Sequence, residues 1–559
     1  MTLKKVEIVS LALLFLSVEM TIYVILSVTI SNYDLLKYPF GLVQELPFSY
    51  WIAEGLTVIS SIFTISQYRN IGSKLYSHLI GIEYLLVLFN SFFVFYFINP
   101  VFILSRDELG HATQVFILLT AHNTVANKGI YEADYPAGYI FGAFSYIVSG
   151  MGPTSFFLYY GPMFFTLFQY IVDYVFIRLF LKPPLSELAG IIYVFSSMPF
   201  APAEWSPQLM SYNLLYPLIL IVGLIVKRGG LRYIPLVIAF TVLSSLTDIA
   251  TFTSTLVLTI PLLWFLKGKY NVTKLVTGYS LFAGLGSYIY WSYLNPAASG
   301  TISGDVTLIR SFVNLLVSTF LPQRATVLSV PAANLVSTFL PPSPFHFISV
   351  ASKLLEGGIF LIGTLISVIF LKLTKKGTRE ITTLVYLGTT LLLFQAVVGL
   401  VDNVSNVLTR MIPQAMIFYV IVLVYYFSVT RTLDRRFIAK LLFIGLIFNV
   451  PLSILGYATI STSEHSPEGA FYSGIILGKY GISTISTYSF YKQIYIYEGD
   501  NSQSLYITSN NVQFIGPYVE TLSEYFNGPN LKGYHEYCGG IVANSTIFFS
   551  SGVVSVSFS

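Results

Sequence analysis

The sequence predicts an all-α polytopic membrane protein of about 13–14 transmembrane helices, followed by a small β-rich C-terminal extracytoplasmic domain. The first observation behind this prediction is the composition, since 55% of the 559 residues are hydrophobic and only 10% are charged. A soluble chain usually carries about 25% charged residues, so too few are present here to cover a soluble fold. The second observation is a mean hydropathy of +0.72. The third is a series of apolar runs of about 17–25 residues, the length that crosses a bilayer core of about 30 Å.

The apolar runs define the predicted spans one by one. The first run follows Lys4 and Lys5 and continues to about Ile30, which is too long for a signal-peptide core, so we predict an uncleaved first helix. The predicted spans are 6–30, 48–67, 78–98, 136–150, 155–181, 187–201, 207–226, 233–247, 250–266, 275–293, 349–371, 381–401, 411–430 and 441–457.

Lysine and arginine residues gather in alternate connections between these spans. The clusters are Lys4/Lys5, Arg69/Lys74, Arg178/Lys182, Lys227/Arg228/Arg232, Lys267/Lys269/Lys274, Lys372/Lys375/Lys376/Arg379 and Arg431/Arg435/Arg436/Lys440. The positive-inside rule places these connections in the cytoplasm. We therefore expect a multi-pass protein of the cell (plasma) membrane, with a cytoplasmic N-terminus and an extracytoplasmic tail.

An even number of spans conflicts with that orientation. Fourteen crossings that start inside also end inside, whereas the charge pattern places the tail outside. One segment within 136–181 must therefore be re-entrant or miscounted. The Gly150-Met151-Gly152-Pro153 break makes 136–150 the weakest full crossing.

The predicted membrane domain, 1–457, has two long outer loops, 99–135 and 294–348. In the first loop, the stretch from Ser105 to about His122 is amphipathic, and such a helix lies in the interface plane. Its apolar side carries Leu109, Val115, Phe116, Leu118 and Leu119. The second loop repeats the sequence VSTFLP at 317–322 and 336–341, and we interpret the two copies as apolar hooks in the headgroup region that could hold a lipid tail.

The tail, 458–559, is rich in Ser, Thr, Tyr and Asn and contains alternating runs such as Ile494-Tyr495-Ile496-Tyr497. With the turn signals at 499–501 and 527–530, this pattern predicts one small β-rich domain. The single cysteine, Cys538, excludes a disulfide framework. No phosphate-binding glycine loop and no basic-aromatic surface is present, which argues against nucleotide-sugar donors and nucleic acid partners.

Acidic residues are concentrated at both ends of the first outer loop. Asp107 and Glu108 follow one span, and Glu132, Asp134 and Tyr135 precede the next. Glu108 has capping-box spacing from Ser105, and Asp107 suits the positive end of a helix dipole, so a structural role remains open for each.

A loop of this kind resembles the GT-C class of membrane glycosyltransferases. The resemblance rests on Asp107-Glu108, Lys128-Gly129 and Tyr135-Pro136-Ala137-Gly138, and its layout covers roughly residues 78 to 460. It implies transfer of a sugar from a polyprenyl-phosphate donor to a glycan, protein or lipid acceptor at the outer face of the lipid bilayer. It also implies that Asp107 is the catalytic base, with Glu108 in reserve. The helices before residue 78 depart from the commonest layout of the class.

Other outer-side residues are candidates for binding the substrates. A departing phosphate needs cations, and Arg410 at the start of a span suits that role, ahead of Arg310 and Arg324. Snorkelling to the interface would explain Arg410 equally well.

Further candidates are a carboxylate and an acidic-aromatic pair on the same side. Asp248 lies at an outer turn, where turn capping is an equal explanation. Glu204 and Trp205 could line an acceptor cleft, with Trp205 stacking on a sugar, although an interfacial tryptophan is more often a belt residue.

A metal site and roles for the carboxylates inside spans stay open. Asp107 and His111 are one helical turn apart and could bind a divalent cation such as Mg²⁺ or Mn²⁺, but a third ligand is not identifiable. Some branches of the resembled class use such an ion and others do not. Glu19, Glu83 and Asp173 fall within predicted spans, where a carboxylate must be paired or hydrated, and the sequence assigns them no role.

Three alternatives to a monosaccharide transferase remain, one of them a non-catalytic membrane scaffold that presents the tail. An oligosaccharyltransferase is the nearest enzymatic one, but the Trp-Trp-Asp motif of that class is absent. A transporter or lipid flippase is the alternative from another class, although the chain lacks the two related halves that transporters usually show.

Overall fold

The structure is a computed structural model, and it describes about half of the chain. The described segments are 4–27, 46–94, 136–151, 156–198, 206–228, 231–247, 378–401, 412–429 and four strands, with single helical residues at 115, 118–119, 255, 257–258, 286, 289, 355, 362, 364–365, 367–369, 371 and 373.

Helices make up nearly all of the described chain. They are α1 (Lys5–Ser27), α2 (Phe48–Ser66), α3 (Ser73–Leu88) with its π-helical continuation η2 (Phe89–Phe93), α7 (Pro136–Ser149), the π-helical turn η4 (Phe156–Tyr160), α9 (Gly161–Phe180), α10 (Leu185–Ser197), α11 (Pro207–Arg228), the 3₁₀ turn η6 (Leu231–Tyr233), α12 (Ile234–Ser245), α18 (Arg379–Val401) and α20 (Ile412–Val429).

Five of the described helices are long and apolar enough to cross a membrane, by length and composition. They are Lys5–Ser27, Phe48–Ser66, Ser73–Phe93, Gly161–Phe180 and Leu209–Arg228. Large apolar side chains on their outer surfaces are exposed, for example Phe15 at 64% and Phe164 at 63%. Because water would penalise such a surface, these helices indicate an association with a lipid bilayer. The membrane-protein prediction is confirmed at this level.

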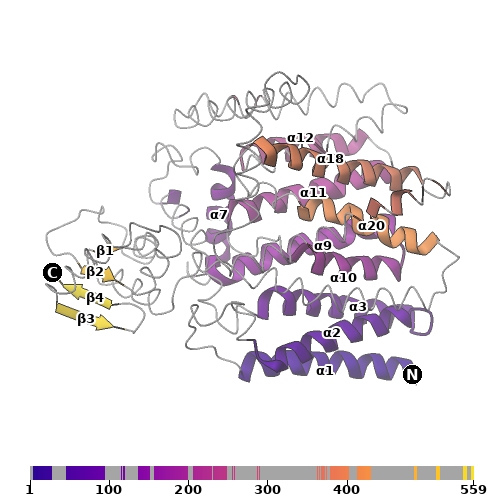
Figure 1. Cartoon of the computed structure of the whole chain (residues 1–559), viewed down its shortest axis with the longest axis horizontal. Coiled ribbons are helices and arrows are strands. Elements are labelled where there is room, and N and C mark those ends of the chain that lie inside the picture. Colours follow the sequence, from indigo (N-terminus) through magenta and orange to yellow (C-terminus); the bar gives the residue numbers. More distant parts are fainter. Residues whose placement is uncertain are drawn as a thin grey trace, which may run out of the picture.

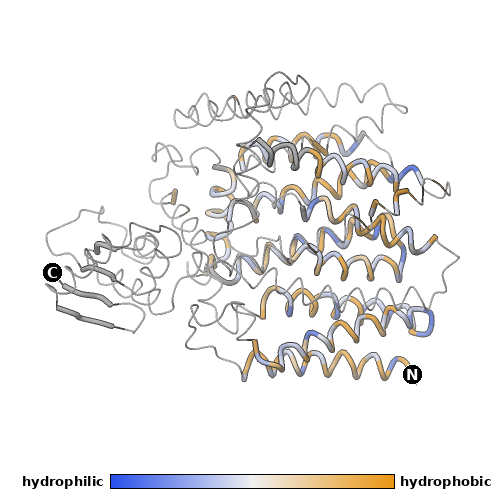
Figure 2. Tube along the Cα trace, viewed as in Figure 1, coloured by the Kyte–Doolittle hydropathy of each residue, from blue (hydrophilic) through white to orange (hydrophobic). Residues whose placement is uncertain are grey.

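The long helices lie side by side in one bundle (Figure 1). Helix α1 packs on α2, and α2 packs on α3. Helix α3 contacts α10, which belongs to a second group of packed helices, α9, α10, α11, α18 and α20. Helix α12 packs against α11. Apolar residues run along the whole length of the helices, while hydrophilic residues concentrate near the turns at one end (Figure 2). The boundaries of these helices agree with the predicted spans within a few residues in most cases.

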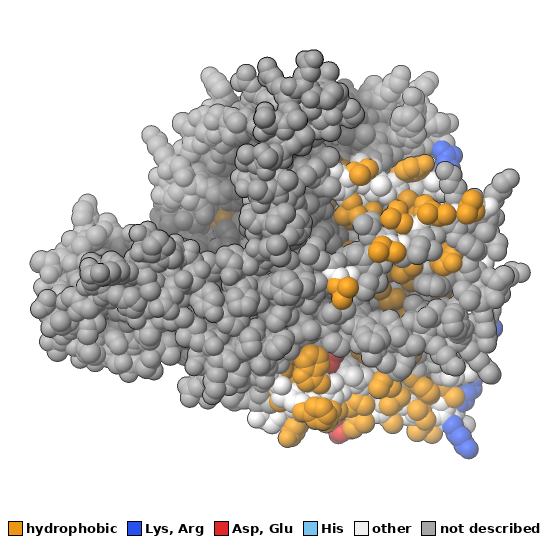
Figure 3. Space-filling view, in the orientation of Figure 1, with side chains coloured by type: hydrophobic (Ala, Val, Ile, Leu, Met, Phe, Trp, Pro, Cys, Tyr) orange, Lys and Arg blue, Asp and Glu red, His pale blue; other side chains and the backbone are white. Residues whose placement is uncertain are grey.

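The described lysines and arginines gather at one end of the bundle, at the right-hand edge of Figure 3. They lie at the start of α1, between α2 and α3, between α9 and α10, between α11 and α12, and at the start of α18: Lys4, Lys5, Arg69, Lys74, Arg178, Lys182, Lys227, Arg228, Arg232 and Arg379. We call this the basic end and the other the distal end. The charge pattern placed these helix connections on one side of the membrane, and in the described part of the chain they all lie at the basic end of the bundle.

Helix α7 lies across the distal ends of its neighbours rather than between the two ends (Figure 1). Its Ala137 N–H donates to the Leu246 carbonyl just after α12, at 2.9 Å. Its buried Tyr139 and Ala143 pack against residues in the first turns of α9 and α11. The helix in the predicted span 136–150 has 14 residues, fewer than the 17–25 that cross a bilayer core, and its described contacts lie at the distal ends of its neighbours. It falls within 136–181, the range in which the charge pattern called for one crossing fewer.

Four short strands form one sheet in the order β1-β2-β4-β3. They are β1 (Thr484–Ser486), β2 (Val512–Ile515), β3 (Thr546–Ser550) and β4 (Ser555–Phe558). Strand β1 pairs parallel with β2, and β4 pairs antiparallel with β2 and β3. The rest of 458–559 lies outside the described residues, so a compact β-rich domain stays a prediction.

Candidate functional site

Three carboxylates are buried among the described helices away from the bundle ends. The exposed fractions of Glu54, Glu83 and Asp173 are 1%, 0% and 0%. Sequence reasoning noticed Glu83 and Asp173 but missed Glu54, although an acid inside the apolar run 48–67 was the same signal. Glu19, the fourth acid placed in a span, is exposed on the surface of α1. A carboxylate within a span is costly, so each buried one needs a physical explanation.

Glu83 has hydrogen-bond partners that explain it. On the facing helix α2, the Ser60 and Thr64 hydroxyls both donate to Glu83 Oε1, at 2.7 and 2.8 Å. Ser60 and Thr64 are four residues apart, so they lie on one face of α2. This contact joins α2 to α3 through Glu83 Oε1, while Glu83 Oε2 has no hydrogen-bond partner.

Glu54 lies in a second polar group, where α1, α2 and η2 meet. The Asn90 side chain accepts a hydrogen bond from Thr21 at 3.0 Å and donates one to Thr57 at 3.0 Å. Tyr50 donates to the Asn90 backbone carbonyl at 3.3 Å. The Asn90 side chain also interacts with the buried Glu54 carboxyl. Because η2 is a π-helical turn, its residue spacing differs from that of an α-helix, and this spacing brings Asn90 into contact with both α1 and α2.

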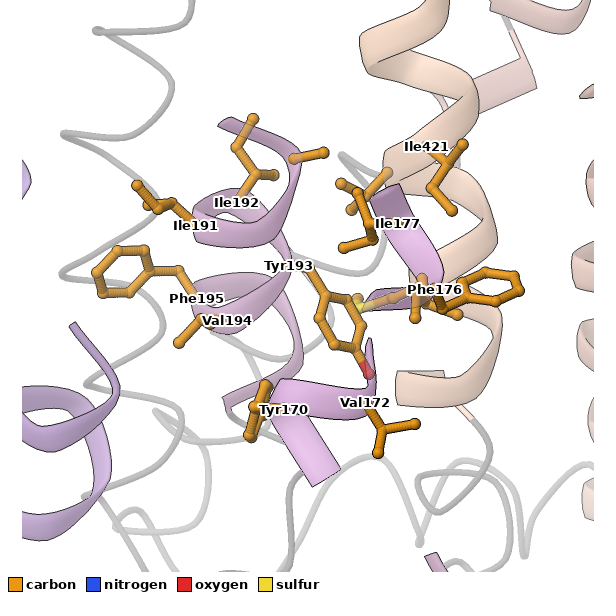
Figure 4. Close-up of a cluster of buried hydrophobic side chains, with 14 of the residues drawn as sticks. Tyr170, Val172, Phe176, Ile177, Ile191, Ile192, Tyr193, Val194, Phe195 and Ile421 are labelled. Atoms are coloured by element: carbon orange, nitrogen blue, oxygen red, sulfur yellow. The ribbon is translucent and has the colours of Figure 1, made fainter. Parts of the chain in front are cut away.

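Asp173 lies where α9, α10, α11 and α20 meet. Tyr193 on α10 and Tyr216 on α11 are both close enough to interact with its carboxyl. The Tyr193 hydroxyl lies 3.2 Å from Tyr216 Oη and 3.5 Å from the Pro413 carbonyl oxygen, to which it donates. Figure 4 shows the Tyr193 side chain reaching from α10 toward α9, with its hydroxyl beside the turn that carries Val172.

An apolar layer closes the bundle between Asp173 and the basic end. Phe176, one turn beyond Asp173, packs edge-on against Phe418 of α20 at 5.7 Å between ring centroids. It also fills the space beside Gly223 of α11, where an added Cβ would lie 2.6 Å from the Phe176 ring. On the face of α9 that carries Asp173, the next side chains toward the basic end, Phe176 and Ile177, are apolar and buried.

More polar side chains continue from Asp173 toward the distal end. Thr166 and Gln169 lie on the same face of α9, about two turns and one turn away, because they precede Asp173 by seven and four residues. Asn213 is one turn distal of Tyr216 on α11, and Gln414 is in the first turn of α20. All four are buried, and each has one side-chain polar atom without a hydrogen-bond partner: Thr166 Oγ1, Gln169 Nε2, Asn213 Oδ1 and Gln414 Oε1.

An apolar cluster occupies the distal ends of α9 and α11. The buried side chains of Val115, Phe165, Leu209 and Met210 belong to it, together with those of α7 and η4, and Leu118 and Leu119 pack against it. Tyr146 of α7 stacks on Phe157 of η4, with ring centroids 5.5 Å apart. Val115, Leu118 and Leu119, three residues of the predicted apolar side of the first outer loop, are helical, and the rest of the predicted amphipathic stretch lies outside the described residues.

The residues that the sequence nominated for catalysis and binding all lie outside the described residues. They are Asp107, Glu108, His111, Glu132, Asp134, Tyr135, Glu204, Trp205, Asp248, Arg310, Arg324 and Arg410. Their roles therefore stay predictions. Within the described part of the chain, no three or more His, Cys, Asp or Glu side chains come together in a way that could hold a metal ion.

Comparison with known proteins adds no family to this description. Neither the models of known protein families nor the curated protein sequences give a match to the chain.

Proposed function

We propose that this protein is a membrane glycosyltransferase. It moves a sugar from a polyprenyl-phosphate donor to a glycan, protein or lipid acceptor at the extracytoplasmic face of the cell membrane. The basic end lies in the cytoplasm under the positive-inside rule, so the distal end faces out and the β-rich tail is extracytoplasmic.

The observation that carries this proposal is the arrangement at the distal end. Helix α7 and the helical residues Val115, Leu118 and Leu119 cover the ends of α9 and α11 with an apolar cluster. Exposed apolar residues line the other side of α7, including Phe144 at 63% and Val148 at 67%. A helix with this distribution lies in the interface, where the phosphate of a polyprenyl carrier also lies. The first outer loop connects η2 to α7 along the chain and contributes Val115, Leu118 and Leu119 to this apolar cluster, which supports a reaction at the membrane surface.

The chemistry follows from the sequence resemblance to the GT-C class. In the proposed step, the Asp107 carboxylate takes the proton of an acceptor hydroxyl, and the acceptor oxygen bonds to the anomeric carbon of the donor sugar. The bond from that carbon to the phosphate oxygen breaks, and its electron pair leaves with polyprenyl phosphate. Configuration at the anomeric carbon is inverted. Arg410, with Arg310 in the second loop, stabilises the charge on the departing phosphate.

We assign substrate positioning to the other residues that the sequence nominated. Glu132, Asp134 and Tyr135 close the same loop, and Glu204, Trp205 and Asp248 line the acceptor side. Asp107 and His111 are the proposed ligands should a divalent ion take part.

Replacement of Asp107 by Asn tests the assignment of the base. We expect loss of about 10²–10⁴-fold in sugar transfer, because Asn keeps the shape of the side chain but cannot take a proton. Expression and binding of the lipid donor should match those of the unmodified protein. Glu108→Gln is compared with it, because this variant removes the reserve carboxylate and leaves Asp107, so a smaller loss than in Asp107→Asn is expected. Full activity in Asp107→Asn would refute the role of this residue.

A second candidate function is transport or lipid flipping, which the buried carboxylates favour. Glu54 and Asp173 are buried within the described helices, and acids inside membrane helices often mark ion or proton pathways in transporters. Flux of labelled polyprenyl-phosphate sugar across protein-containing vesicles separates the two functions. Donor that crosses the bilayer intact supports transport, whereas donor that is cleaved supports the transferase.

A further inference from the structure

Glu19 is an acidic side chain on the outer surface of α1, a helix long and apolar enough to cross a membrane. The helix spans Lys5–Ser27. At about 1.5 Å per residue, Glu19 is about 21 Å from Lys5 and about 12 Å from Ser27 along the helix axis. In a bilayer the exposed carboxyl therefore lies well inside the hydrocarbon core, where it is costly unless another polar group contacts it.

Contacts near both ends of α1 fix the face on which Glu19 lies. Near the basic end, the Glu7 carboxylate accepts a hydrogen bond from the Gly72 backbone N–H at 3.1 Å. In the distal half, the Thr21 hydroxyl donates to Asn90 Oδ1 at 3.0 Å. Glu7 and Thr21 belong to the buried face of α1, which packs on α2. Glu19 precedes Thr21 by two residues and so lies about 200° around the helix from it, on the outer face.

The outer face around Glu19 has the residue spacing of a helix-packing surface. Among the described helices, α1 lies at the edge of the bundle (Figure 1). Six exposed residues alternate four and three positions apart along it, and we call them the α1 seam: Ile8, Ala12, Phe15, Glu19, Ile22 and Leu26. This spacing lets the side chains of one helix pack between those of a parallel neighbour. The small side chain of Ala12 permits close approach of a second backbone.

A proton on Glu19 removes its charge but not its need for hydrogen bonds. A protonated carboxyl has one O–H donor and a carbonyl acceptor. Lipid chains offer a partner to neither, and each unpaired polar group in the hydrocarbon core costs free energy. Whatever covers the α1 seam must therefore present both a donor and an acceptor at the depth of Glu19.

A second copy of this chain meets that requirement by symmetry. All copies have the same orientation in the membrane, because the same lysines and arginines set it. A two-fold axis along the membrane normal then makes the two α1 helices parallel and brings each seam residue opposite its own counterpart at equal depth. Two protonated Glu19 carboxyls that face each other exchange two hydrogen bonds, each O–H donating to the carbonyl oxygen of the other. The lysines and arginines of the described helices lie at the basic end, at another depth.

We propose that two copies of this protein associate in the membrane through the α1 seam, with the two Glu19 carboxyls hydrogen-bonded to each other across the two-fold axis. The apolar seam residues pack on both sides of this pair. A single polar residue in such a seam also fixes the register, since a shift of one helix by a turn leaves both carboxyls unpaired. The interface is independent of the proposed sugar transfer, because it uses none of the residues assigned to that reaction.

Disulfide formation between single cysteines tests the position of the interface. The full-length protein with Cys538→Ser is reconstituted into liposomes that contain no other protein, and Phe15→Cys or Ile22→Cys is added. A disulfide needs Cα atoms within about 7 Å, so we expect both seam variants to form covalent dimers on oxidation. The matched control is Ile171→Cys, at a position 45% exposed near the middle of α9, and it should stay monomeric. Absence of dimers in both seam variants, or equal yield in the control, would overturn the proposal.

Two substitutions of Glu19 test the pairing of the carboxyls. Energy transfer between fluorescently labelled copies, measured in liposomes at increasing lipid-to-protein ratios, gives the dissociation constant of the dimer. We expect Glu19→Leu to raise this constant about tenfold, because it removes both hydrogen bonds. Glu19→Gln should stay close to the unmodified protein, because an amide also has a donor and an acceptor.

Both substitutions are on the surface of α1, so helical content measured by circular dichroism should match that of the unmodified protein. An unchanged dissociation constant in Glu19→Leu would overturn the carboxyl pairing. A monomeric unmodified protein in liposomes would overturn the dimer itself. So would pairing of α1 only with a lysine- or arginine-bearing helix of another protein in native membranes.

Discussion

Gly223 shows at the scale of one residue how tightly the core of this bundle is packed. A Cβ added there would lie 2.6 and 2.9 Å from two atoms of the Phe176 ring. The ring cannot move freely, because Phe418 and Phe180 hold it by edge and tilted contacts. Gly55 of α2 is the opposite case, with no other atom within 4 Å of the added Cβ.

We predict that Gly223→Ala lowers the free energy of unfolding by about 1–3 kcal/mol through overpacking. Gly55→Ala should instead be neutral or raise it by about 0.5–1 kcal/mol, since alanine restricts the unfolded chain more than glycine does. Denaturant titration in detergent micelles, followed by circular dichroism, measures both. Equal effects of the two substitutions would show that Phe176 does not confine Gly223.

Individual polar residues were the hardest part to predict from the sequence. The apolar runs marked Glu83 and Asp173 as unusual, but the sequence does not reveal that Ser60 and Thr64 donate to Glu83 Oε1 or that Tyr193 and Tyr216 lie beside Asp173. These contacts depend on which helices become neighbours. Asn90 is likewise placed by a π-helical turn, which has no clear sequence signature.

At the scale of whole elements, the sequence predicted most of the described helices. Their positions follow from apolar length alone, because each must satisfy its backbone internally in a membrane. Helix α7 was the exception. Its sequence is as apolar as a span, and only the Ala137 contact to Leu246 and the packing at the ends of α9 and α11 show that it stays at one level.

The position of α7 predicts the result of cysteine labelling. In a Cys538→Ser background, cysteines at Ala137 and Ser149, near the two ends of α7, should both react with a membrane-impermeant thiol reagent from the extracytoplasmic side. A helix along the interface keeps both ends at one depth. Labelling of one position from each side would mean that α7 crosses the membrane.

At the scale of the whole molecule, the described bundle has basic residues at one end and an apolar cluster at the other. The sequence predicted this polarity from the alternation of Lys and Arg, since that alternation depends only on helix order. The nominated catalytic residues could not be tested in the same way, because Asp107 and its companions lie outside the described residues.

The measurement that tests the central claim most directly is sugar release from a labelled polyprenyl-phosphate donor by the purified full-length protein. It is run with a mixture of glycan, protein and lipid acceptors beside Asp107→Asn. Our account predicts that the unmodified protein consumes the donor and that Asp107→Asn does not. Failure of a folded, unmodified preparation to consume any donor would contradict the account and favour transport.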